Sequence, residues 1–207
     1  RNELLVQMTD EVAQLVLKNN YRQTGAISVA RSETLYRMGE YKRYIHALVN
    51  DGKLDRELEY IPSDEELHDR IVNGKGLTRP ELCTLLSYTK AILKDELTHS
   101  TLPDDDYICH EIEKAFPRVL VERFPQPLYG HKLRREIVAT QVASSMVDFM
   151  GITFVHRMKD AAGASVADIA RAFIASRDVF DLESWWHQIE TLDHKIDASE
   201  QLAMMRM

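Results

Sequence analysis

Three side chains in the middle of the chain, His99, Cys109 and His110, are of the types that bind transition metals. Zinc sites are usually built from pairs of ligands at a fixed short spacing, such as C-x-x-C. Cys109 and His110 are adjacent, so on a helix they point to different faces. The pattern therefore predicts no metal site at these positions.

Three consecutive carboxylates, Asp104, Asp105 and Asp106, are candidates for calcium binding or for paired-carboxylate catalysis. The EF-hand pattern is absent, because neither Gly nor Glu stands at the required offset. Asp is also a preferred residue just before a helix, where its oxygens accept backbone N–H groups. We interpret these residues as helix caps.

A small glycine-containing segment, Gly74-Lys75-Gly76, is the nearest match to a phosphate-binding loop. A dinucleotide-binding loop needs three close glycines between a strand and a helix. Here the third glycine is missing and the segment follows a helical pattern. Lys75 and Arg79 near a helix start can attract an anion, but this signal is generic. The segment is predicted to be a loop between helices.

The remaining candidates lie near the C-terminus. Trp185 and Trp186 can stack on a ligand, but one buried and one half-exposed indole is the more ordinary arrangement. His187 and His194 are interpreted as solvated helix histidines, with Asp193 close by. Two capped helices over 165–193 resemble a helix-turn-helix in outline, but the second is poor in Lys and Arg. No nucleophile–base pair is found, and we assign no catalytic, cofactor-binding or metal-binding residue.

Composition narrows the class of protein further. The 207 residues carry a net charge of −7, which argues against nucleic acid as a partner. No segment approaches the ~20 consecutive apolar residues of a membrane span, so no membrane association is expected. The N-terminus lacks an apolar signal core, which predicts a cytoplasmic protein. Cys83 and Cys109 are expected to be buried, reduced thiols.

The elements that would hold these residues are helical throughout. The spacing of apolar residues predicts an all-α, irregular multi-helix bundle of roughly nine or ten helices. A core helix is expected over 131–158, with a broad apolar stripe and small residues where another helix can approach. Gly151 interrupts it, and the run Ile152–Val155 is either a bend or a short strand. A bend is favoured, because no second strand-like run is present to pair with it.

Local signals place the other helices. Capping boxes at Ser63–Glu66 and Thr78–Glu81 predict two helix starts, the second strengthened by Pro80. Apolar periodicity predicts one helix from Asn2 to about Arg22 and another from about Thr24 to Val49. The chain starts without Met and ends inside a helical pattern. We therefore expect a piece of a longer polypeptide.

Several segments resemble one family. Residues 1–24 (RNELLVQMTDEVAQLVLKNNYRQT) are similar to the segment that follows the dehydrogenase core of the large bacterial NAD-specific glutamate dehydrogenases. Matches to the C-terminal region of that family follow in the same order and extend over nearly the whole chain. They are Gly76-Leu-Thr-Arg-Pro-Glu-Leu82, Leu133-Arg-Arg-Glu-Ile-Val-Ala-Thr140, Gly151-Ile-Thr-Phe154 and Gly163-Ala-Ser165.

The resemblance implies a large cytoplasmic enzyme that oxidises L-glutamate to 2-oxoglutarate and ammonia with NAD⁺. Its NAD-binding and catalytic residues lie upstream, and no position here matches them. Residues 1–22 would be the terminal helix of the upstream dehydrogenase core, and 23–207 a helical C-terminal domain without activity of its own. That domain would support the upstream domain or mediate contacts in a homo-oligomer. The alternative is an independent helical module that binds a partner protein.

Overall fold

The computed structural model describes residues 2–206, which form eleven α-helices and two 3-10 helices and contain no strand. The predicted all-α fold is confirmed. The elements are α1 (Asn2–Glu33), α2 (Met38–Asn50), α3 (Asp64–Val72), α4 (Arg79–Thr98), η1 (Leu102–Asp104), η2 (Ile108–Ala115), α5 (Arg118–Arg123), α6 (Pro125–Tyr129), α7 (Arg134–Met150), α8 (Phe154–Ala162), α9 (Val166–Val179), α10 (Leu182–Glu190) and α11 (Ala198–Met205).

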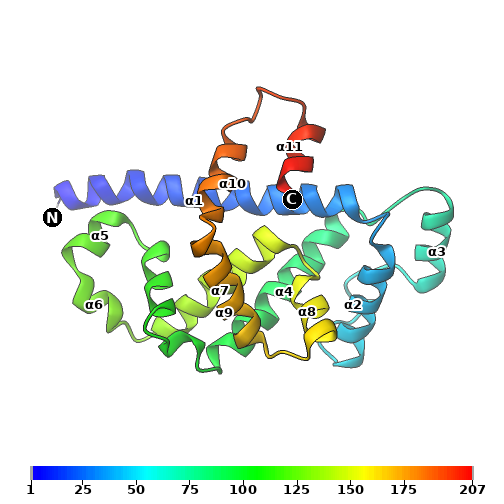
Figure 1. Ribbon diagram of the computed structural model, residues 1–207, viewed down its shortest axis with the longest axis horizontal. Coiled ribbons are helices and arrows are strands. Elements are labelled where there is room, and N and C mark those ends of the chain that lie inside the picture. Colours follow the sequence, from blue (N-terminus) through cyan, green and yellow to red (C-terminus); the bar gives the residue numbers. More distant parts are fainter. Residues whose placement is uncertain (1, 207) are drawn as a thin grey trace.

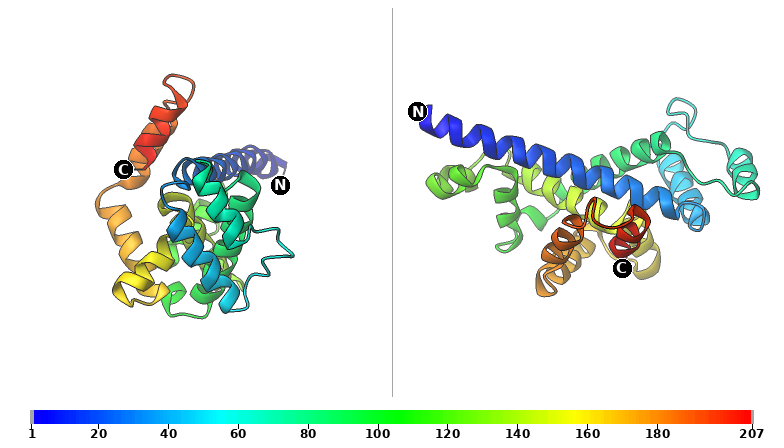
Figure 2. Two further views of the ribbon diagram at one scale, coloured as in Figure 1. Left: turned by 90° about the vertical axis from the view of Figure 1, so that its right-hand side faces the viewer. Right: turned by 90° about the horizontal axis from the view of Figure 1, so that it is seen from above.

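A central pair of helices organises the body. α4 and α7 pack against each other more extensively than any other pair of described elements, and α1 lies across both of them (Figure 1). α2 and α3 continue from one end of α1, whereas α5 and α6 lie under its other end. α9 leads to α10 and α11, which pack together and project from the body (Figure 2).

The helix α4 begins where the sequence signal predicts. The backbone N–H of Thr78 donates to Glu81 Oε2 at 2.7 Å, and Pro80 occupies the first turn. Downstream of this cap, the apolar face is fully buried at Leu82, Leu85, Leu86, Leu93 and Leu97. Each such side chain contributes on the order of 1.5–3 kcal/mol through burial. A strong cap and a strong apolar face therefore specify the same helix.

The core helix is interrupted where Gly151 predicts a break. α7 ends at Met150, α8 begins at Phe154, and the two axes differ by 89°. Gly151 has φ of 92°, a left-handed conformation that side chains disfavour. The favoured bend is therefore confirmed. α7 starts three residues later than predicted, and Leu133, the residue before its first turn, is exposed.

The length and apolar character of the helices were compared with what a membrane span requires. Within residues 2–206, no single helix has both the length and the apolar character required to span a bilayer. The bent pair α7 and α8 meets that requirement only when its two helices are counted together.

The predicted boundary between the first two helices is wrong. α1 is one helix of 32 residues, about 48 Å long at 1.5 Å per residue, and it continues through Gly25 to Glu33. Gly25 costs about 1 kcal/mol in a helix, but Ile27 and Ala30 just beyond it are buried in the core. Burial of this C-terminal half therefore outweighs the local penalty.

Other predictions of detail need correction. The sequence also predicts a short turn of helix over residues 54–60, but the chain makes non-helical turns there. α6 forms where the sequence predicts no helix. Both cysteines are free thiols, but Cys83 is exposed and Cys109 is half-buried, so the expectation of burial is wrong. At both positions the neighbouring apolar side chains occupy the side of the helix that is buried in the core, so the cysteine itself lies away from the core.

The cap of α3 gives a first testable prediction. Ser63 Oγ accepts from Glu66 N at 3.2 Å, and Glu66 Oε2 accepts from Ser63 N at 2.7 Å. α3 projects from the body and buries one leucine, Leu67, so this cap is a large share of its stability. Ser63→Ala should lower stability by about 1 kcal/mol. Hydrogen exchange of the amides in 64–72 should accelerate while exchange in α4 stays unchanged.

Candidate functional site

The metal-ligand candidates are not brought together. His99 ends α4, and its Nδ1 lies 2.8 Å from the carbonyl oxygen of Asp95. On η2, His110 Nδ1 lies 2.6 Å from the hydroxyl of Tyr129. Within residues 2–206, no group of three His, Cys, Asp or Glu side chains has the geometry to hold a metal ion.

Two of the three aspartates, Asp104 and Asp105, have structural roles. Asp105 Oδ1 accepts from the backbone N–H groups of Tyr107 and Ile108 at 3.0 and 3.2 Å. It closes the turn that leads into η2, whereas the N-cap position of that helix is Tyr107, so the predicted cap is displaced to the preceding turn. Asp104 instead pairs with Arg134 and Arg135 at the start of α7. These contacts fasten the η1 turn to the central helix.

The glycine segment is a loop between α3 and α4, as predicted. At Gly76 the chain passes so close to the turn after α1 that a Cβ would lie 2.0 Å from Thr34 Oγ1. The same hydroxyl accepts from Leu77 N at 3.2 Å, and Arg79 Nη1 donates to Ser28 Oγ at 3.1 Å. Close backbone contact explains Gly76, and the Arg79 guanidinium is already engaged.

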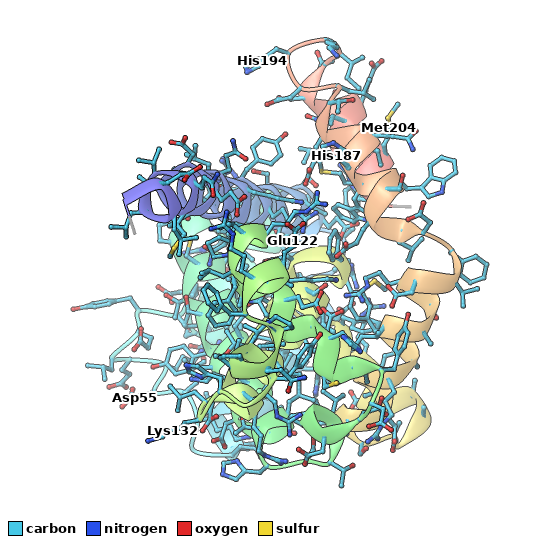
Figure 3. All side chains as sticks on the ribbon, turned by 90° about the vertical axis from the view of Figure 1, so that its left-hand side faces the viewer. Asp55, Glu122, Lys132, His187, His194 and Met204 are labelled. Carbon is cyan, nitrogen blue, oxygen red and sulfur yellow. The ribbon has the colours of Figure 1, made fainter. Side chains whose placement is uncertain are left out.

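The C-terminal candidates lie on the projecting pair. Trp185 is 62% exposed, and Trp186 is half-buried with its ring 4.8 Å from that of Phe149. The expectation of one buried and one half-exposed indole is wrong, because neither Trp185 nor Trp186 is buried. His187 is on α10 but His194 is in the turn after it, so they do not share one helix face, and both are largely solvated (Figure 3).

A polar cavity of about 180 Å³ lies between α1, η2, α7 and α10. We call it the polar cavity, and most of its lining side chains carry a charge or a hydrogen-bonding group. The lining residues are Leu15, Lys18, Asn19, Arg22, Glu111, Lys114, Gln141, Ser144, Ser145, Asp148, Phe149 and Glu183. A cavity with these walls can bind a small polar molecule.

The α7 wall of the polar cavity is a polar stripe on an otherwise apolar helix. Gln141, Ser144, Ser145 and Asp148 follow the spacing of one helix face. Ser144 and Ser145 are among the small residues of this helix that the sequence predicts will admit a neighbouring helix. Val142, Met146 and Val147, which lie between these residues in the sequence, are buried in the core. A polar stripe on a core helix was therefore the sequence signal that could have indicated the cavity.

Two of the carboxylates in this cavity are each held by a cation from outside it. Lys90 Nζ on α4 lies 2.7 Å from Asp148 Oδ1, and burial raises the pKa of Asp148 while Lys90 offsets part of that increase. Arg177 on α9 donates to both oxygens of Glu111.

The third carboxylate of the polar cavity, Glu183, pairs with Lys114 Nζ at 3.1 Å. Burial acts to raise the pKa of Glu183, but the charge of Lys114 lowers it overall. All three acidic groups in the cavity therefore have a cationic partner.

A wider groove continues from the polar cavity along the first half of α1. This α1–α5 groove has a volume of about 720 Å³ and shares Leu15, Lys18 and Lys114 with the polar cavity. Phe116 and Val121 add apolar surface from the other side, and Glu122 on α5, labelled in Figure 3, also lines the groove. α5 holds α1 here through polar contacts, such as Val119 N to Glu11 Oε2 at 3.2 Å.

Beside this groove, α1 exposes an apolar stripe. Leu5, Val12 and Val16 follow heptad-like spacing and are 51%, 43% and 52% exposed. The neighbouring positions on that face, Thr9 and Asn19, are uncharged. The sequence-based prediction that this face is apolar is correct, but the described residues leave it largely uncovered.

Comparison with known proteins identifies the family to which the chain is similar. A family model described as glutamate dehydrogenase, C-terminal, matches residues 74–207. NAD-specific glutamate dehydrogenases from Pseudomonas aeruginosa and Halomonas elongata are 52% and 50% identical to the chain over 205 residues. The Mycobacterium tuberculosis protein of the same name is 36% identical over 204 residues.

Each match covers 99% of this chain but only 13% of the relative, so the chain spans about an eighth of the length of these proteins. The resemblance found in the sequence is thus confirmed over nearly all residues. Because the family model matches well over half of the chain, the chain belongs to the glutamate dehydrogenase C-terminal family.

Proposed function

We propose that the whole protein is an NAD-specific glutamate dehydrogenase and that this chain is its helical C-terminal part. The reaction is L-glutamate, NAD⁺ and water to 2-oxoglutarate, ammonia and NADH. The observation that supports this proposal is the identity of 52% and 50% to enzymes of that name along nearly the full chain. In this proposal NAD and substrate bind outside residues 1–207, and the enzyme is a cytoplasmic homo-oligomer.

The role of this part is to support the dehydrogenase domain that precedes it. α1 is buried in the helical body at its second half and exposes the stripe Leu5, Val12 and Val16 at its first half. A charge-free apolar stripe over this length of helix is typical of a docking surface. Residues 1–22 would pack against the dehydrogenase part and 23–207 would form the C-terminal domain, with one helix shared by both.

The alternative, an independent interaction module, is less well supported. The relatives carry this sequence as 13% of a much longer protein. A module with a complete surface of its own would also have no need for an exposed apolar stripe on its first helix.

Charge substitution in the intact enzyme tests the proposal. Val12→Asp should lower NAD-dependent glutamate oxidation at least about tenfold, because a buried unpaired carboxylate would separate the two parts. Val72→Asp is the matched control, since Val72 is 73% exposed on α3, and it should retain activity.

The two halves of the proposal fail in different ways. An intact protein that does not oxidise glutamate with NAD⁺ would refute the assigned activity. Full activity and unchanged thermal stability of the Val12→Asp enzyme would refute the docking role alone. Turnover by residues 1–207 without the preceding part would show that the active site is not upstream.

A further inference from the structure

Two serines in the polar cavity lack the internal bonds that other helix hydroxyls make. Thr140 Oγ1 donates to Glu136 O, Thr89 Oγ1 donates to Leu85 O, and Ser28 Oγ donates to Thr24 O, each to the carbonyl one turn back. Such back-bonding is the usual state of a hydroxyl inside a helix. Ser145 Oγ is buried without any hydrogen-bond partner, and Ser144 makes no side-chain hydrogen bond within residues 2–206.

An unpartnered buried hydroxyl is costly, so a group outside the chain is expected to satisfy it. Gln141, one turn before Ser144 and Ser145, also has a side-chain amide without a partner in the described part of the chain, and it lines the same cavity. Together these three side chains offer hydroxyl and amide donors on one helix face. They mark the α7 wall as the hydrogen-bonding wall of a site.

The opposite wall carries two cations, Lys18 and Arg22. Asp148, Glu111 and Glu183 each have a cationic partner, as described above. Arg22 has one ion pair, at 3.4 Å to Glu190, and its guanidinium lies 5.1 Å from the Phe149 ring centre. Lys18 lines the cavity and has no ion pair with the described residues. Among the described lining residues, Lys18 is therefore the cation that is left to receive an anionic ligand.

We propose that the polar cavity binds a small organic acid, with its carboxylate at Lys18 and Arg22 and its polar substituent at Ser144, Ser145 and Gln141. Charge-assisted hydrogen bonds from Lys and Arg favour a carboxylate in a partly enclosed site. The cavity, at 180 Å³, has room for about six waters or one small organic molecule, but not for a nucleotide. This site is separate from the dehydrogenase activity proposed above and does not depend on it.

The test uses the intact protein with L-lactate as the probe and lactamide as its uncharged counterpart. Saturation-transfer NMR should detect lactate binding, with lactamide at least about tenfold weaker because it lacks the charge. Lys18→Gln should weaken lactate binding about tenfold, and Ser145→Ala should weaken it several-fold. Lys18 is exposed, so its substitution leaves the packing of α1 unchanged.

Lys132→Gln is the matched control, because Lys132 is exposed far from α1 at the other end of the body (Figure 3). It should bind lactate as the parent protein does. Equal binding of lactate and lactamide, or lactate binding unchanged by both Lys18→Gln and Ser145→Ala, would overturn the proposal. So would a lack of any lactate binding, which would leave water as the occupant of the cavity.

Discussion

Arg177→Met is expected to lower the free energy of unfolding by about 3–5 kcal/mol. Arg177 and Glu111 have side chains only 3% and 8% exposed, and the guanidinium donates to both carboxylate oxygens at 2.7 and 3.2 Å. Loss of the cation would leave Glu111 buried with only Lys114, 3.2 Å away, as a partner. That remaining contact places the expected loss at the lower end of the range.

Urea denaturation followed by circular dichroism measures this loss. The matched control is Arg171→Met on the same helix, where the ion pairs are more exposed and a change below about 1 kcal/mol is expected. Arg177→Met combined with Glu111→Leu should recover most of the loss, because no buried charge would remain unpaired. An Arg177→Met protein as stable as the parent would show that the Arg177–Glu111 pair contributes nothing to the free energy of unfolding.

Gly76→Ala and Gly25→Ala should change stability in opposite directions. At Gly76 a Cβ would lie 2.0 Å from Thr34 Oγ1 and 3.1 Å from the backbone nitrogen of Leu35, so the turn that follows α1 must move. We expect a loss of about 2–3 kcal/mol from this overpacking. At Gly25 nothing lies within 4 Å of the position that a Cβ would occupy, and alanine should stabilise α1 by about 0.5–1 kcal/mol.

The same denaturation measurement separates local strain from a general intolerance of alanine. Thr34→Gly should relieve part of the Gly76→Ala defect, because it removes two of the three atoms that a Cβ would meet. If Gly76→Ala were neutral while Gly25→Ala stabilised, the close passage of the loop over α1 would be wrong.

Local signals predicted the parts of the fold where short-range and long-range interactions agree. Thr78, Pro80 and the leucines of α4 specify one helix, and Gly151 specifies one bend. The continuity of α1 was missed because the penalty at Gly25 is local, whereas the burial of Ile27 that offsets it depends on residues distant in sequence.

The buried charges and the polar cavity were beyond sequence reasoning for the same reason. Arg177 precedes Asp178 on a helix, which is also typical of a solvated face, and its partner Glu111 is 66 residues away. Gln141, Ser144 and Ser145 gave a visible stripe on α7, but the cations that face them come from α1. Only the fold brings Lys18 and Arg22 to that stripe.

The unbroken course of α1 also sets the helical phase of whatever is attached at its N-terminal end. One residue inserted near position 22 would rotate the preceding part by about 100° and shift it by about 1.5 Å, whereas a loop would absorb the same insertion. An insertion of seven residues would nearly restore the orientation, with a displacement of about 10 Å. Length changes in this segment are therefore transmitted as rigid rotations, and chimaeras joined within α1 must keep its register.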